Sequence, residues 1–377
     1  MNRLIIILLI LLSIEGCTTL KAIRHGSPST DTYRNFDLDT IHGAESAQPL
    51  PESDDRYLST AVFDGSQFHG ETVGEYFGRA RGNGSLLILR NDSILVEEYF
   101  GNVNRSTPVN IFSISKAITS LLCGIAIDEG YIESVADPVV KYMPELSDAD
   151  PMFAKLTIEH LLDMRTGLDF KEEYGWNPFS KMAKLYYGDD VVNFISKAKF
   201  KEEPGTSHYY NSLSTAILGV VIERATGKQY AQYLEDKVWK PLGMEYDTYI
   251  ALDSRKQHNA KAYGGIATTA RNIAKIGSLY LNDGKYLGKQ IVDTEWVNRS
   301  IHSHLGNEAY SYGWNNIITP DGDGMLITPR FFAIGLYGQV LFCDPEQNLI
   351  FVTLGEKKAY EYHIIFDDLC NLLKSRK

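Results

Sequence analysis

Two serines and a lysine occupy the stretch FSISK at residues 112–116, between a polar, turn-like segment and an almost wholly apolar run. Side chains three positions apart in a helix lie on one face, so Ser113 and Lys116 can meet, whereas Ser115 points about 100° away from Lys116. A serine hydroxyl is a weak nucleophile unless a neighbouring group takes its proton, and a desolvated lysine can assist. The spacing therefore favours Ser113 as a nucleophile with Lys116 as its partner.

The Ser-x-x-Lys pattern is weak by itself, because a second copy runs from Ser196 to Lys199. That copy lies in a polar, amphipathic stretch, whereas the helix after Ser113 is apolar on nearly all sides. A buried, unpaired ammonium costs several kcal/mol. We therefore expect Lys116 to face a cleft, and the alternative on local evidence is a solvated lysine at a helix N-terminus.

A candidate third residue lies far along the chain, in the loop-like stretch EPGTSHYYN at residues 203–211, just before an apolar helix. A tyrosine at the edge of a cleft can transfer protons if a nearby ammonium favours its phenolate, and Tyr209 is in a suitable place. The alternative is a loop aromatic that only packs on the fold. Asn211 in that case simply caps the following helix.

The elements that must position these residues follow a simple order along the chain: strands, a buried helix, a helical block, strands and a terminal helix. Strands at both ends with helices between them predict an α/β (α+β) fold, in which an antiparallel sheet is completed by both termini and flanked by helices. An all-helical subdomain is inserted at about 131–250, and the cleft beside it is the expected site. The expected strands are a hairpin at 85–100 and a pair at 337–345 and 348–355; the expected helices are one from 112 to near 130, one at the start of 269–288, and one at 360–374.

The N-terminus is typical of an exported protein. The apolar run from Leu4 to Leu12 is too short to span a bilayer comfortably and indicates a signal peptide at residues 1–16. The following Glu15-Gly16-Cys17 resembles the end of a bacterial lipobox, in which the cysteine is lipidated, although Glu15 is an unusual occupant. We expect a membrane-anchored lipoprotein of the periplasm or outer surface, with residues 17–70 as a lipid-anchored tether and N-terminal segment. A plain cleaved signal and an uncleaved anchor are the alternatives.

Composition excludes several classes of function. A formal net charge of -11 and a pI near 5.4 argue against a nucleic-acid partner. No Gly-x-Ser-x-Gly motif and no dinucleotide-binding glycine pattern is present. His302 and His304 are a possible metal pair, but two such residues are more typical of a surface loop. We expect neither a metal nor another cofactor, and the sequence does not indicate an oligomeric state.

Several ordered stretches resemble the serine β-lactamase and penicillin-binding-protein superfamily, in its class C-like branch, and are closest to 6-aminohexanoate-dimer hydrolase and related esterases. FSISKAITSLL is similar to the nucleophile motif, and EPGTSHYYNSLS to the Tyr-x-Asn segment. The resemblance covers roughly residues 80–375. It implies a β-lactamase/transpeptidase-like serine hydrolase domain at 71–377. The remaining stretches that carry it are LTIEHLLDMRTGLDF, VWKPLGMEYDTYI, AYGGIATTARNIAKIGSLYLNDG and FFAIGLYGQVLFCDPEQNLIFV.

The resemblance implies a role for each matched residue. Ser113 forms an acyl-enzyme, Lys116 is its base or proton relay, and Tyr209 is the second base and general acid. Asn211 supports the substrate or Lys116. The backbone N–H groups of Ser113 and Leu336 form the oxyanion hole. Substrate-pocket residues on the last strand are Gly335, Gly338 and Gln339, where glycine lets the strand pass close to substrate.

One departure bears on the substrate. The last strand reads Ala-Ile-Gly-Leu-Tyr-Gly-Gln where β-lactamases and penicillin-binding proteins of this superfamily carry Lys-Thr-Gly. Loss of that cation weakens recognition of a substrate carboxylate. We therefore expect hydrolysis of a small ester or amide, with β-lactamase or D-alanyl-D-alanine peptidase activity as the alternative. A non-catalytic binding protein that kept the fold is a further alternative.

Overall fold

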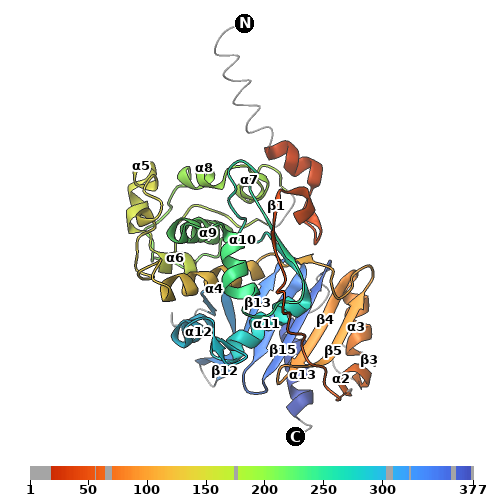
Figure 1. The fold of residues 1–377 in the computed structure, drawn as a ribbon. Helices are drawn as coiled ribbons and strands as arrows, with labels where there is room; N and C mark the ends of the chain where they lie inside the picture. The colour runs from red at the N-terminus through yellow and green to blue at the C-terminus, as the bar shows by residue number, and fades with distance from the viewer. Residues whose placement is uncertain are drawn as a thin grey trace.

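The protein was analysed as a computed structural model, which describes residues 18–55, 57–63, 70–173, 177–302, 309–321, 324–357 and 362–374. Its centre is a seven-stranded antiparallel sheet in the order β11-β12-β13-β14-β15-β4-β5 (Figure 1). The strands are β4 (Gly84–Arg90), β5 (Ser93–Phe100), β11 (Tyr310–Ser311), β12 (Trp314–Asp321), β13 (Gly324–Gly335), β14 (Gln339–Asp344) and β15 (Leu349–Gly355).

The two ends of the chain meet inside this sheet. β15 pairs with β4 along seven residue pairs, from Leu349 opposite Arg90 to Gly355 opposite Gly84. The predicted sheet completed by both termini is therefore confirmed, as are the hairpin of β4 with β5 and the strand pair of β14 with β15.

Both faces of the sheet are buried, which explains why its central strands are continuously apolar rather than alternating. Successive side chains point to opposite faces, so Ile350 and Val352 belong to the main core while Leu349 and Phe351 belong to a second, smaller core. Helices α4 (Ile114–Asp128) and α11 (Ala270–Leu281) contact the sheet on the main-core side. Helices α3 (Val73–Arg81) and α13 (Tyr362–Lys374) pack into the smaller core on the other face.

A helical layer stands next to the sheet, with α4 at the boundary between them (Figure 1). It contains the long buried helix α9 (Ser212–Thr226), which packs on α4. The other helices of this layer are α5 (Leu146–Ala149), α6 (Ile158–Leu162), α7 (Lys181–Tyr187), α8 (Val191–Ser196) and α10 (Tyr230–Leu234).

A small second sheet, which the sequence pattern did not predict, joins the N-terminal segment to the body. Its order is β1 (Leu38–Ile41), β7 (Thr248–Ala251), β8 (Ile266–Thr268) and β6 (Val109–Asn110). β6 is followed almost directly by FSISK, and its partner β8 precedes α11. This sheet therefore connects the N-terminal segment with the start of α4.

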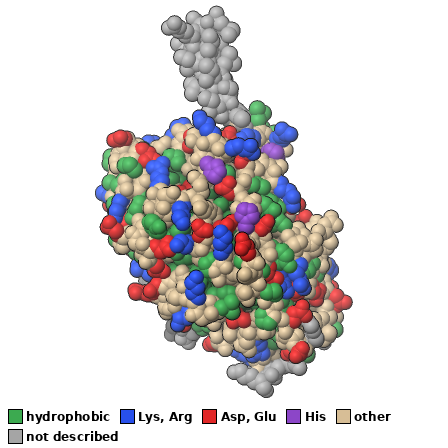
Figure 2. Space-filling model, in the orientation of Figure 1, with side chains coloured by type: hydrophobic (Ala, Val, Ile, Leu, Met, Phe, Trp, Pro, Cys, Tyr) green, Lys and Arg blue, Asp and Glu red, His purple; other side chains and the backbone are tan. Residues whose placement is uncertain are grey.

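The predicted signal peptide and Cys17 lie outside the described residues. Within the described part of the chain, no helix is both long and apolar enough to cross a membrane. Acidic and basic side chains are interspersed over the face drawn in Figure 2.

Candidate active site

Ser113 occupies the N-cap position of α4, at the point where a strained turn leads into the helix. Phe112, directly before it, has a positive φ of 48°, which is costly for a non-glycine residue and persists where the surroundings enforce it. Here the Oδ1 atom of Asn110 accepts a hydrogen bond from the Phe112 N–H at 3.0 Å. The Ser113 hydroxyl does not cap the helix, so it stays available for Lys116.

Lys116 is buried, with 2% of its surface exposed, and its ammonium group contacts three acceptors. Nζ donates to Ser113 Oγ at 2.8 Å, to Ser212 Oγ at 3.1 Å and to the carbonyl oxygen of Tyr263 at 3.0 Å. The ring of Tyr210 adds a cation–π contact, with Nζ 5.0 Å from its centroid. Since an ammonium has three N–H donors, these three bonds give every N–H group of Lys116 an acceptor.

The structure distinguishes the two serines of FSISK as helical spacing predicts. Ser113 is half-buried and borders the cavity beside Lys116. Ser115 is fully buried inside the protein, and its Oγ has no hydrogen-bond partner among the described residues. A hydroxyl in that position is inaccessible to a substrate.

Two glycines allow backbone to press against the start of α4. A Cβ atom on Gly335, at the end of β13, would lie 2.3 Å from the carbonyl oxygen of Ile111. A Cβ atom on Gly313, which has a φ of +91°, would lie 2.8 Å from Cα of Ala117. These close approaches bring the short helix η5 (Leu336–Gly338) beside Ser113.

The pocket residues predicted on the last strand divide into two groups. Gly335, Leu336 and Gly338 border the cavity that also contains Ser113 and Lys116. Gln339 does not: its side chain is fully buried and exchanges two 2.7 Å hydrogen bonds with the backbone of Gly355. The prediction that Gln339 lines the substrate pocket is corrected accordingly, because this side chain instead joins neighbouring strands.

The position of the predicted catalytic tyrosine also needs correction. Tyr209 is 38% exposed, and Lys201 Nζ lies 4.0 Å above its ring. Tyr210, the next residue, borders the cavity with Ser113 and contacts Lys116. The structure thus places Tyr210, not Tyr209, beside the serine–lysine pair.

Asn211 likewise does not reach Lys116. It caps α9: its Oδ1 accepts hydrogen bonds from the Ser214 N–H and hydroxyl, both at 2.9 Å, and its Nδ2 donates to the Tyr209 carbonyl. The residue that contacts Lys116 from this segment is Ser212, which the sequence analysis did not identify. Asn211 has extended backbone angles, and side chains two positions apart along extended chain share a side. This explains why Tyr210 and Ser212 both face Lys116.

Glu172 is a second residue that sequence patterns did not reveal. Its carboxylate accepts hydrogen bonds from the Ser212 hydroxyl at 2.6 Å and from the Ser212 N–H at 2.7 Å. A continuous chain of hydrogen bonds therefore runs from Ser113 through Lys116 and Ser212 to Glu172. No spacing in the sequence connects these two segments, since the loop around Glu172 and the start of α9 meet only in the fold.

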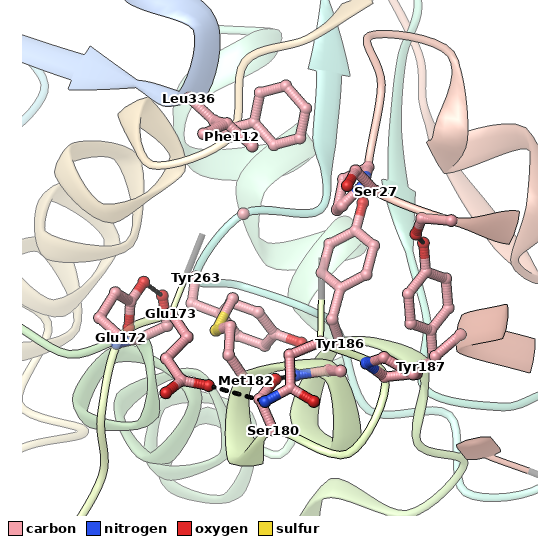
Figure 3. A pocket seen from close by; sticks show the side chains of 18 of the residues that line it. Ser27, Phe112, Glu172, Glu173, Ser180, Met182, Tyr186, Tyr187, Tyr263 and Leu336 are labelled. Carbon is pink, nitrogen blue, oxygen red and sulfur yellow. Dashed lines mark hydrogen bonds between the residues drawn. The ribbon is translucent and has the colours of Figure 1, made fainter. Parts of the chain in front are cut away.

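Ser113 lies where two cavities meet. One, the apolar cavity, has a volume of about 700 Å³ and a mainly apolar lining (Figure 3), and the other, the lysine cavity, contains Lys116. Leu336 and Ser113 border both cavities. In Figure 3, Phe112 and Leu336 lie at one end of the apolar cavity, with Met182 and Tyr186 at the other. A substrate can therefore place a group in each cavity, on either side of its reacting carbonyl.

Burial distinguishes the tyrosines around the lysine cavity. Burial raises the pKa of Tyr310 well above its ordinary value, and Tyr210 and two carboxylates, those of Asp163 and Glu172, raise it further. Burial also raises the pKa of Tyr337, whose hydroxyl donates to the carbonyl oxygen of Pro28. Both phenols therefore stay protonated, which leaves Tyr210 as the candidate for proton transfer. Among the described residues, no group of three or more His, Cys, Asp or Glu side chains is arranged to hold a metal ion.

Comparisons with known proteins show which family and fold the chain is similar to. The family model described as Beta-lactamase matches residues 71–362. A 6-aminohexanoate-dimer hydrolase from Paenarthrobacter ureafaciens is 27% identical over 337 residues, which cover 83% of this chain and 79% of that protein. A solved structure described as "Putative 6-aminohexanoate-dimer hydrolase from Bacillus anthracis" shares the fold, with a TM-score of 0.79 and 22% identity over 92% of this chain and 94% of that one. An octameric penicillin-binding protein homologue from Pyrococcus abyssi has a TM-score of 0.58 and 21% identity over 79% and 74% of the two chains.

Proposed function

Because the chain belongs to the beta-lactamase family of serine hydrolases, we propose that it cleaves a small ester or amide through an acyl-enzyme on Ser113. The observation that carries this proposal is the 2.8 Å hydrogen bond between Lys116 Nζ and Ser113 Oγ, at the junction of two cavities. A buried cation is costly to place in a helix whose buried residues are mainly apolar, and its position next to a half-buried hydroxyl therefore favours a role in chemistry over one in packing.

Each step of the proposed reaction uses a group in this arrangement. Ser113 Oγ bonds to the carbonyl carbon and gives up its proton. The Lys116 ammonium donates three N–H hydrogen bonds and has no lone pair to take this proton, so the proton passes to Tyr210, which enters the step as a phenolate next to the lysine charge. The backbone N–H groups of Ser113 and Leu336 stabilise the oxyanion. The C–O or C–N bond then breaks, Tyr210 returns the proton to the leaving group, and water releases the acyl group by the same path.

The charges around the cavities support an ester or amide without a carboxylate. Glu172 and Glu173 border the apolar cavity, and no Lys or Arg is among the described residues that line it. Lys116 is the cation among the described residues that border the lysine cavity, and its three hydrogen bonds are already made. A carboxylate-bearing substrate, such as a β-lactam, would therefore meet negative charge without a free cation to pair with.

The test of the proposal combines covalent labelling with a panel of substrates. A fluorophosphonate probe should label the purified protein at Ser113, as read by peptide mass spectrometry. We expect turnover of p-nitrophenyl acetate. The linear 6-aminohexanoate dimer has a free carboxylate, so turnover of this dimer as fast as that of the ester would contradict the preference for substrates without a carboxylate and extend the likeness to the Paenarthrobacter relative. If the probe does not label the protein and no ester or amide is turned over, the proposed function is ruled out. Nitrocefin turnover as fast as ester turnover would instead favour a β-lactamase.

We also propose that the protein is exported and lipidated at Cys17, because the sequence up to that residue has the signal-peptide and lipobox pattern. Expressed in a bacterium fed radiolabelled palmitate, the full chain should carry the label and sediment with membranes, whereas Cys17→Ser should lose the label. Membrane sedimentation of the wild type without label would favour an uncleaved anchor. Release of unlabelled protein from the membrane would favour a plain signal peptide.

A further inference from the structure

The N-terminal strap, which we define as residues 18–30, forms one wall of the apolar cavity. It begins as a helix at 18–25, and Gly26, with a φ of +69°, ends that helix and turns the chain along the cavity. Ala22, Gly26, Ser27 and Pro28 all border the cavity that contains Ser113. Figure 3 shows Ser27 across the cavity from Glu172 and Glu173. The strap lies outside residues 71–362, which match the family model.

Several contacts fix the strap to elements on both sides of the cavity. The Tyr187 hydroxyl, at the end of α7, donates to the carbonyl oxygen of Gly26 at 2.8 Å. The Tyr337 hydroxyl, in η5, donates to the carbonyl oxygen of Pro28 at 2.6 Å. The Asn110 N–H, in β6, donates to the carbonyl oxygen of Thr30 at 3.0 Å, and Lys21 forms an ion pair with Asp189. The strap thus bridges the helical layer and the elements next to Ser113.

The three hydrogen bonds are accepted by backbone carbonyl oxygens of the strap. They therefore fix the position of its backbone and do not use the side chains of Ser27 and Pro28. The side chains that meet the substrate space from the opposite walls are largely apolar, including Phe112, Met182 and Leu336. A cavity of this composition receives an uncharged hydrocarbon group. Its size and depth are set on one side by the strap.

We propose that the N-terminal strap is a specificity element, which completes a binding site for the apolar acyl chain of an uncharged ester or amide and limits the length of that chain. This inference rests on the proposed acylation of Ser113, because the cavity leads to that hydroxyl. Each methylene that gains a dry contact in the cavity should raise kcat/KM about fourfold, until the chain reaches the strap.

The proposal can be tested by replacing Ser27 with cysteine and modifying the new thiol after the protein has folded, so that the bulky group does not interfere with folding. Ser27 is an exposed residue that borders the cavity, so Ser27→Cys should be tolerated. In a Cys17→Ser background the introduced thiol is the one a bulky maleimide should reach, because Cys123, Cys343 and Cys370 are buried. The readout is kcat/KM for p-nitrophenyl esters from acetate to decanoate, before and after modification.

We expect the modified protein to keep its activity on acetate and to lose at least about tenfold in kcat/KM on octanoate, which corresponds to fewer than two lost methylene contacts. Ile23→Cys, modified in the same way, is the matched control, since Ile23 is 48% exposed on the strap helix and does not border the cavity. An unchanged chain-length profile in modified Ser27→Cys, or an equal change in modified Ile23→Cys, would overturn the proposal. Absence of activity on every ester before modification would instead refute the proposed function.

Discussion

Replacing Ser113 by alanine is expected to lower kcat/KM for p-nitrophenyl acetate by at least about 10⁴-fold, because no acyl-enzyme can form. Lys116→Met should cause a loss of similar size. It removes the ammonium that contacts Ser113 Oγ at 2.8 Å and keeps the length and apolar character of the side chain in its buried site. Steady-state kinetics on the purified variants measure both losses.

The double variant gives the sharper result. If Ser113 and Lys116 act as one unit, Ser113→Ala combined with Lys116→Met should be no slower than either single variant, since residues of one catalytic unit are strongly non-additive. Losses that multiply in the double variant would contradict a shared role. Ser115→Ala is the matched control within the same motif: its hydroxyl is buried away from the cavity, so its kinetics should stay close to wild type. Loss of fluorophosphonate labelling in Ser115→Ala but not in Ser113→Ala would reverse the choice of nucleophile.

The choice between these two serines was predictable because it depends on local geometry alone. The relation of Ser113 to Lys116 is fixed by helical spacing, and the apolar run after them ensures that a helix forms and is buried. The same reasoning predicted the sheet, since the strands β4, β14 and β15 are long, apolar and bounded by turns. Features that depend on one continuous segment could thus be predicted from the sequence.

The segment at 209–212 was harder because its direction depends on where α9 begins. Reading Tyr-x-Asn from Tyr209 assigned Asn211 a place in the site, whereas its side chain is used to cap α9. With Asn211 assigned as the N-cap of α9, its side chain points to the helix, and Tyr210 and Ser212, on either side of it in extended chain, point the other way. The signal was therefore present, but the capping interaction competed with the motif for the same asparagine.

Other parts of the site depend on contacts between distant segments and left no local signal. Glu172 meets Ser212 across 40 positions of the chain. The strap is a short, largely polar segment without hydrophobic periodicity. Strand β1, which follows it, has only four residues. A strand of that length is stabilised by its pairing with β7 rather than by its own pattern. Local sequence patterns alone do not predict which short strands pair.

The assignment of Tyr210 leads to the second large expected effect. Tyr210→Phe should lower kcat for p-nitrophenyl acetate by about 10²- to 10⁴-fold and leave KM nearly unchanged, because it removes only the hydroxyl that transfers the proton. The phenyl ring keeps its position over Lys116, at 5.0 Å, and its edge-to-face contact with Tyr310, at 5.7 Å. A loss of stability is therefore not expected, and a thermal melt of each variant checks this.

Tyr209→Phe is the matched control, since it makes the same chemical change one residue earlier, on an exposed ring that stacks under Lys201. Its kcat should remain near the wild-type value. A large loss in Tyr209→Phe with little change in Tyr210→Phe would restore the tyrosine first predicted from the sequence, and it would require the loop at 203–211 to rearrange when substrate binds. Equal, small effects in both variants would mean that neither phenol moves the proton. In that case Lys116 would have to give up one of its own protons before the freed lone pair could take the proton of Ser113. Ser212→Ala, which removes the acceptor of one Lys116 N–H, should then accelerate acylation.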